Sequence, residues 1–245
     1  MTGNILELGT QRTAGRRAEQ RLPSLESGYL HEIHAQCDDW AAATLFALSA
    51  LVRGRQGQIL AVRIPQQGKF CAMPCADGLA GLGIEPGRLV IVHAASALEL
   101  LRAGLEGARC PGIAGVMLET WGKVAEYDLT ASRRFSLAAE RSQLPVVILR
   151  GEGEPRPSSA QTRWAIESAP SMELPGRAPG LPVIEAELLR QRGGPAGMRW
   201  RLEWDAEDGC FRETAMPGAV VPLPLLRAGE EGVRAIPGRD HSRAA

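Results

Sequence analysis

The sequence GYLHEIHAQCDDWAAATLFALSALV, residues 28–52, decides the fold of this chain. Tyr29–His34 is a short β-rich run, and Asp39–Val52 is an almost wholly apolar helix. A strand that enters a helix through a short turn is the unit from which parallel sheets are built. Because the helix has almost no polar face, we expect other elements to cover most of its circumference.

Further β-rich runs alternate with helical stretches up to Arg150, which is the pattern of a parallel sheet covered by helices. The expected strands are Gln58–Ile64, Arg88–His93, Ile113–Leu118 and Val146–Leu149. The last three contain LVIV, AGVML and VVIL, which are apolar on both faces and predict strands at the sheet centre. Helices are expected at Ala95–Ala108, with Leu98, Leu101 and Leu105 on one stripe, and at Leu129–Ser142 after the cap Asp128.

A second pattern begins after GEGEPRP, residues 151–157. Four short runs separated by Pro, Gly and Asp predict antiparallel strands added to the sheet edge: Trp164–Glu167, Val183–Arg190, Met198–Trp204 and Cys210–Thr214. The fold class is therefore α/β, a mostly parallel sheet flanked by helices with an antiparallel β extension at its C-terminal side. We divide the chain into a flexible arm (1–27), a core (28–216, with 28–150 parallel α/β and 158–216 the extension) and a Pro/Gly-rich tail (217–245).

Composition excludes several classes of protein. The chain has 28 Lys+Arg and 28 Asp+Glu, so no chain-wide basic field attracts nucleic acid. Five cysteines without zinc-ligand spacing indicate reduced thiols, and we expect no metal and no cofactor. No secretory signal is apparent, and the longest apolar run is shorter than the ~20 residues that a bilayer requires. We expect a cytoplasmic protein that does not bind membranes.

The turn between the first strand and its helix is where a phosphate-binding loop would lie. It contains Ala35, Gln36, Cys37, Asp38, Asp39 and Trp40, with Thr44 one turn into the helix. It has no glycine for close backbone approach and no lysine, and the carboxylates of Asp38 and Asp39 would repel a phosphate. No Walker A motif occurs elsewhere around Lys69 or Lys123, the chain's two lysines. The turn is a degenerate equivalent of that motif, and we expect no catalytic residues.

Glu119 and the histidines offer the remaining candidates for chemistry. Glu119 closes the strand GVMLE at the carboxyl end, where α/β proteins place functional groups, and it is either a metal-phosphate acid or a strand-end cap. His31 and His34 lie on opposite faces of the first strand and therefore do not form a pair. Structural or surface roles are expected for them.

Several segments resemble the ImuA proteins, the RecA-like partners of mutagenesis cassettes. Residues 28–52 resemble the strand and helix that flank the Walker A loop of RecA recombinases, with the loop itself lost. The ImuA resemblance is carried by GLAGLGIEPGRLVIV (78–92), EYDLTASRRFSLAAERS (126–142), PSSAQTRW (157–164) and IEAELLRQRGG…MRWRLEWD (184–205). It covers roughly residues 26–212.

The resemblance implies a RecA-like core without ATPase function that acts as an adaptor in SOS-induced error-prone DNA synthesis. It implies as partner an ImuB-like protein, an inactive homologue of Y-family polymerases, and through it the error-prone C-family polymerase and the sliding clamp. RecA is a further candidate, and direct DNA contact is left open. The alternatives are a SulA-like inhibitor of cell division and a RecA-type ATPase with an atypical nucleotide site.

Two segments are candidate partner-binding surfaces. Arg133, Arg134 and Arg141 point away from the core side of the helix at 129–142 and are expected to contact the partner. Ile5, Leu6 and Leu8 are the densest apolar cluster of the arm, and by resemblance to RecA they would dock on a second copy. So short a segment supports only weak self-association.

Overall fold

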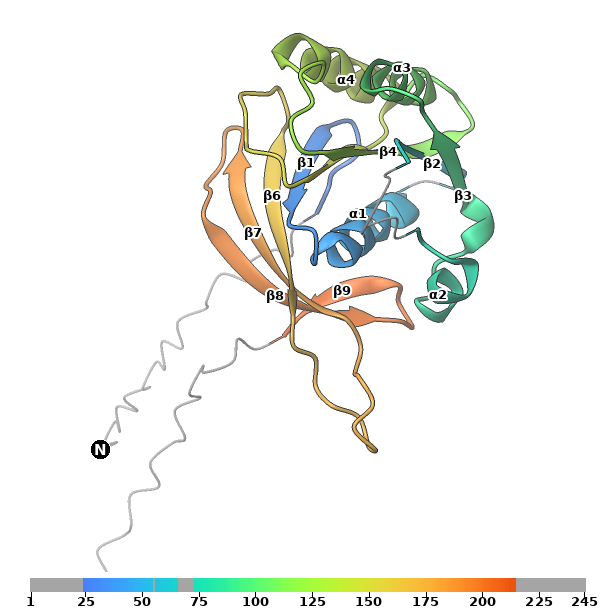
Figure 1. Ribbon diagram of the computed structural model, residues 1–245, viewed down its shortest axis with the longest axis vertical. Helices are drawn as coiled ribbons and strands as arrows, with labels where there is room; N and C mark the ends of the chain where they lie inside the picture. Colours follow the sequence, from blue (N-terminus) through green and yellow to red (C-terminus); the bar gives the residue numbers. More distant parts are fainter. Residues whose placement is uncertain (1–23, 55, 66–72, 215–245) are drawn as a thin grey trace, which may run out of the picture. The chain divides into compact units, whose positions relative to one another are not determined.

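A computed structural model describes residues 24–54, 56–65 and 73–214 of the chain. Within these residues, nine strands form one sheet in the order β3-β2-β4-β5-β1-β6-β7-β8-β9 (Figure 1). The strands are β1 (Leu30–Ala35), β2 (Gln58–Arg63), β3 (Leu89–His93), β4 (Ile113–Trp121), β5 (Val146–Gly151), β6 (Thr162–Ala169), β7 (Val183–Gln191), β8 (Met198–Asp205) and β9 (Cys210–Glu213).

The helices cover the two faces of the parallel part of the sheet. They are α1 (Trp40–Gly54), α2 (Ala76–Gly81), α3 (Ala97–Gly107) and α4 (Leu129–Ser142), with a short 3-10 helix at Pro86–Arg88. One face packs on α1, and the other packs on α3 and α4, which lie side by side (Figure 1). The predicted fold class, an α/β sheet with helices and an antiparallel extension, is confirmed.

The strands β3, β2, β4, β5, β1 and β6 pair in parallel, and only β6–β7, β7–β8 and β8–β9 pair antiparallel. The prediction that the runs after residue 158 form antiparallel ribbons holds for β7, β8 and β9, and it holds only in part for β6, which pairs antiparallel with β7 but parallel with β1. After β5 the chain crosses β1 and returns in the same direction, so β6 extends the parallel sheet before the antiparallel pairing begins at β7.

The apolar strand LVIV is likewise not at the sheet centre. It forms β3, which pairs only with β2 and leaves Val90 41% exposed. An apolar sequence on both faces does not distinguish an edge strand from a central one, because the number of hydrogen-bonded neighbours depends on pairing across the whole chain.

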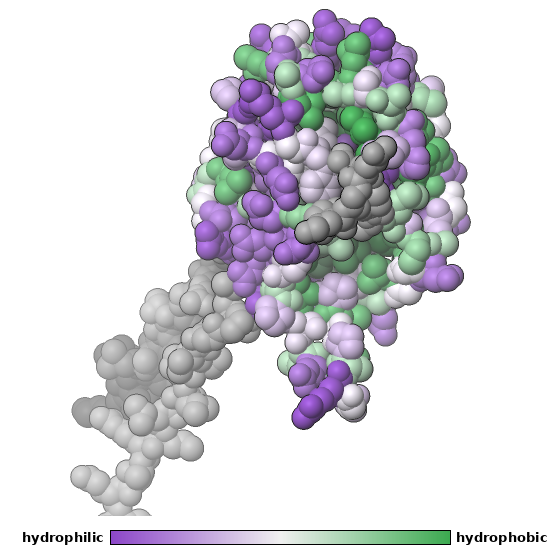
Figure 2. Space-filling model, viewed as in Figure 1, coloured by the Kyte–Doolittle hydropathy of each residue, from purple (hydrophilic) through white to green (hydrophobic). Residues whose placement is uncertain are grey.

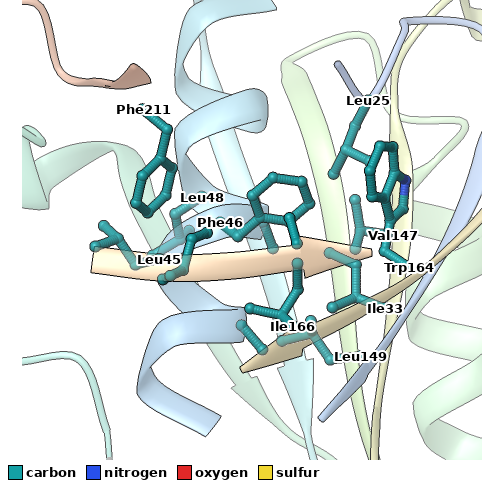
Figure 3. Packing of buried hydrophobic residues seen from close by; sticks show 14 of the residues in the cluster. Leu25, Ile33, Leu45, Phe46, Leu48, Val147, Leu149, Trp164, Ile166 and Phe211 are labelled. Atoms are coloured by element: carbon teal, nitrogen blue, oxygen red, sulfur yellow. The ribbon is translucent and has the colours of Figure 1, made fainter. Parts of the chain in front are cut away.

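The antiparallel strands cover the side of α1 that faces away from the parallel strands. Phe46 of α1 lies between Trp164 of β6 and Phe211 of β9, with ring centroids 5.6 and 6.2 Å apart (Figure 3). Trp200, Leu202 and Trp204 of β8 are buried in the same cluster. This arrangement confirms that the apolar helix is covered on most of its circumference.

The core begins before residue 28. Leu25, placed in the predicted arm of residues 1–27, is 5% exposed and packs in the cluster around α1 (Figure 3). The backbone oxygen of Glu26 accepts a hydrogen bond from His31 Nε2 at 2.9 Å. Residues 24–27 are therefore fastened to β1. The rest of the arm, with Ile5, Leu6 and Leu8, and the tail 217–245 lie outside the described residues.

Candidate functional site at the carboxyl edge of the sheet

The turn from β1 to α1 is held by its own backbone and by β6. The backbone N–H of Asp39 donates to Gln36 at 3.2 Å, and that of Trp40 donates to Cys37 at 3.3 Å. Asp39 Oδ1 accepts the N–H of Ser168 at 2.7 Å. Gln36 and Asp38 are exposed, and Thr44 is buried in α1. The two carboxylates that were predicted to repel a phosphate thus have different environments. Asp39 holds the turn against β6, and Asp38 is exposed to solvent.

Beside this turn, two tryptophan rings lie in contact at the ends of three strands. Ala35 of β1, Gly151 of β5 and Trp121 of β4 are register partners on one face of the sheet. A Cβ atom on Gly151 would meet Trp121 Cε3 at 2.5 Å, so only glycine leaves room for the indole. Trp121 then reaches Trp40, with ring centroids 4.4 Å apart and an interplanar angle of 37°. Aromatic carbon fills this part of the carboxyl edge.

Glu119 lies on the same face as Trp121, two residues earlier in β4. Its register partner on β2 is Arg63, and the Oε2–Nη2 distance is 3.3 Å. Both side chains are buried, and the side chain of Trp40 also hydrogen-bonds to Glu119. Burial raises the pKa of Glu119 to about 7, and the charge of Arg63 opposes that rise. The predicted strand-end acid is therefore paired with a buried arginine.

A second polar cluster lies on the opposite face of the sheet, around Glu32 of β1. The hydroxyl of Tyr127 donates to Glu32 Oε1 at 2.9 Å, and Arg163 Nε donates to Oε2 at 2.8 Å. The guanidinium of Arg150 lies 5.7 Å from the Tyr127 ring centroid. Burial and the neighbouring Glu32 hold the pKa of Tyr127 well above its usual range. A buried carboxylate that is fully hydrogen-bonded ties the loop before α4 and strand β6 to β1.

Arginines from β6 and β7 also fix the segment after β5. Arg163 Nη2 donates to the backbone oxygen of Arg156 and to Ser158 Oγ, and Arg190 Nη2 donates to the Ser158 oxygen at 3.1 Å. His34 Nδ1 donates to the oxygen of Gly153 at 3.0 Å. Residues 153–158 are thus bound to the body of the chain.

The histidines have structural environments, as expected. His31 Nδ1 lies 2.8 Å from Thr162 Oγ1, which also accepts the indole N–H of Trp164 at 2.8 Å. The Thr162 hydroxyl can therefore donate to a neutral His31 ring. Burial lowers the pKa of both His31 and His34 to about 4.

The three arginines of the predicted partner surface are exposed on α4. Arg134 and Arg141 line a common groove against the end of α3, whereas Arg133 does not line it. This surface lies on the face of the sheet opposite α1 and apart from the Trp40–Trp121 pair. The predicted site residues within the described part of the chain therefore lie in two separate regions.

Several residues of the carboxyl edge were missed by sequence reasoning. Arg63 ends an apolar strand, and Trp121 follows the predicted end of the fourth strand. The available signal was a charged residue closing the run QILAV together with a small residue, Gly151, after the run VVIL. Only the register across β1, β5, β4 and β2 brings these positions together.

The geometry defines a mixed α/β protein whose sheet edge is closed by an aromatic pair and a buried ion pair. The chain is similar to the RadB recombinase, whose crystal structure matches it with a TM-score of 0.49 at 14% sequence identity, over 78% of this chain and 92% of that one. No protein-family model and no curated protein matches the chain. Among the described residues, no helix has the length and apolar character needed to cross a membrane.

Proposed function

We propose that this chain is a non-catalytic, RecA-like adaptor of the ImuA type that acts in SOS-induced error-prone translesion synthesis. Its partner is an ImuB-like protein, and through that partner it is linked to the error-prone polymerase and the sliding clamp. RecA is a second partner to test. The observation that carries the proposal is the Trp40–Trp121 pair next to the degenerate Walker-equivalent turn.

The argument for a non-catalytic role rests on what phosphoryl transfer needs. Such chemistry needs backbone N–H groups and a lysine around the phosphates, with a carboxylate free to hold a metal ion. Here the turn is bound to β6 through Asp39 at 2.7 Å, and Glu119 is paired with Arg63 at 3.3 Å. The rings of Trp40 and Trp121 lie in contact beside them. These contacts support a site that serves packing.

The first experiment measures ATP binding to the full chain. A ligand raises the melting temperature only if it binds the native state. We expect no shift in melting temperature with millimolar ATP and magnesium, and no heat of binding in calorimetry. A dissociation constant in the low micromolar range would favour the ATPase alternative and overturn the proposal.

The second experiment measures partner choice. The tagged full chain is mixed with purified ImuB-like protein from the same genome, and separately with the division GTPase. We expect a complex of defined stoichiometry with the ImuB-like protein alone. Capture of the division GTPase without the ImuB-like protein would favour the cell-division inhibitor instead.

A further inference from the structure

A groove with a volume of about 390 Å³ lies between the end of α3 and the outer face of α4. Arg134, Leu137, Ala138 and Arg141 line it from α4, and Arg109 lines it from the residues that follow α3. The α4 residues are three, four and seven positions apart, so they form one stripe along the helix. The groove is thus a continuous surface with both charged and apolar parts.

The charge of the groove is positive. Among the described residues, Arg134 and Arg141 are exposed and form no ion pair, while Arg109 shares an exposed pair with Glu106 at 3.0 Å. Both helices end here, and each helix end contributes a partial charge of roughly −0.5. The positive charge of the three guanidinium groups is larger than the negative charge of the one carboxylate and the two helix ends, so the groove attracts an acidic ligand.

The apolar part of the groove favours protein over nucleic acid. Leu137 is 51% exposed between the arginines, and Ala138 is buried next to it. A nucleic acid backbone would offer phosphates but no aliphatic side chain to cover Leu137, and bases stack on aromatic rings rather than on leucine. The surface over α3 and α4, at the top of Figure 2, is mostly hydrophilic with separate hydrophobic residues. Charge and shape together fit an amphipathic segment.

We propose that the α3–α4 groove binds a helical segment of a partner protein that carries carboxylates on both sides of an apolar side chain. The apolar side chain covers Leu137, and the carboxylates pair with Arg134, Arg141 and Arg109. The inference rests on the proposed function for the partner's identity, in which the segment belongs to the ImuB-like protein. It narrows the predicted surface, because Arg133 lies outside the groove.

The test compares two double variants of the full chain with the same change in charge. Arg134→Glu/Arg141→Glu reverses the charge of the groove, and Arg102→Glu/Arg177→Glu reverses the charge of two exposed arginines outside it. The probes are the ImuB-like protein and an 18-residue amphipathic helical peptide with leucines flanked by glutamates. We expect the groove variant to bind each probe about tenfold or more weakly, and the control variant to change binding by less than about twofold.

Two further changes test the same contact. Replacing the peptide's glutamates by glutamine, which leaves the chain unaltered, should weaken binding, and so should the variant Leu137→Ser of the chain. Equal losses in both double variants, no loss in either, or an equally tight glutamine peptide would overturn the inference. Single-stranded DNA that binds more tightly than the peptide and is lost in the groove variant would overturn it in favour of nucleic acid.

The outcomes separate the inference from the proposed function. If the wild-type chain captures the ImuB-like protein and the groove variant captures it equally well, the groove assignment fails and the adaptor function stands. If the wild-type chain binds the glutamate peptide as described but does not capture the ImuB-like protein, the adaptor function fails and the groove chemistry stands.

Discussion

Gly151 is the residue on which the aromatic pair depends. It is the register partner of Trp121, and a Cβ there would meet the indole at 2.5 Å. Gly151→Ala should lower the free energy of unfolding by roughly 1–3 kcal/mol, because overpacking displaces the Trp121 ring from Trp40. Urea denaturation followed by tryptophan fluorescence measures this change. Gly112→Ala is the control, since a Cβ there meets nothing within 4 Å; equal losses would contradict the explanation.

His31 should make the free energy of unfolding depend on pH. Its pKa is lowered to about 4 in the folded chain, from 6.5 when it is unfolded. Above pH 6.5 both states hold a neutral ring, whereas between pH 6.5 and 4 only the unfolded state gains the proton. The free energy of unfolding should therefore fall as the pH is lowered through this window, by up to about 3 kcal/mol from this group.

The measurement is a series of urea titrations between pH 7.5 and 4. A His31→Gln variant should be less stable than wild type at pH 7.5, because it disturbs the contacts to Thr162 and Glu26. It should nevertheless lose less stability on acidification. Parallel pH profiles for the two proteins would show that His31 is not the titrating group.

At the scale of elements, strand β8 serves as the cover of helix α1. Trp204 is 1% exposed, its indole N–H donates to the Leu82 oxygen at 3.2 Å, and Phe211 packs edge-on at 5.0 Å. Trp204→Ala should cost about 3–5 kcal/mol and give poorly soluble protein. Arg199→Ala, on the other face of β8 in an exposed ion pair with Glu187, should cost less than about 1 kcal/mol. A soluble Trp204→Ala variant with a normal melting temperature would contradict the core assignment.

The elements that could be predicted from sequence are those with a local signal. Helix α4 spans Leu129–Ser142 as expected, and Asp128 Oδ1 caps it by accepting the Ala131 N–H at 2.7 Å. The buried face of α3 could not be predicted in this way, because Leu98 of the expected stripe is 49% exposed. The face that packs on the sheet includes Gly104 and Gly107, where a Cβ would approach Leu118 and Leu60 to 2.7 and 2.2 Å. A count of apolar side chains misses this contact, because the helix approaches the sheet closely where its glycines have no side chain.

The candidate site likewise has local features that the sequence shows and long-range contacts that it does not show. The absence of glycine and lysine from residues 35–40 can be read from the sequence, because it is a local feature. The contacts around this turn are not local. Arg63 meets Glu119 through pairing between β2 and β4, and Trp121 meets Trp40 through the ends of β4 and β1. Those partners are more than 50 residues apart, so no motif records them.

At the scale of the whole molecule, the described residues form one folded unit around β1. This strand pairs with β5 on one side and β6 on the other, and α1 is covered by β8 and β9. A fragment of residues 1–157 should therefore be unfolded or aggregated, because it leaves one edge of β1 and one side of α1 open. Circular dichroism and urea titration measure this. A fragment that unfolds cooperatively would mean that the parallel part of the sheet is stable alone.

The position of β1 also sets the order of events during synthesis. His31 and Glu32 are joined to Thr162 and Arg163, each across 131 residues of chain. At 5–20 residues per second a ribosome needs roughly 7–26 s to extend from the first of these residues to the second. Throughout that interval the central strand and the apolar helix have been made but lack their cover. We therefore expect slower translation of the second half to lower the yield of folded chain, because apolar surface stays exposed for longer.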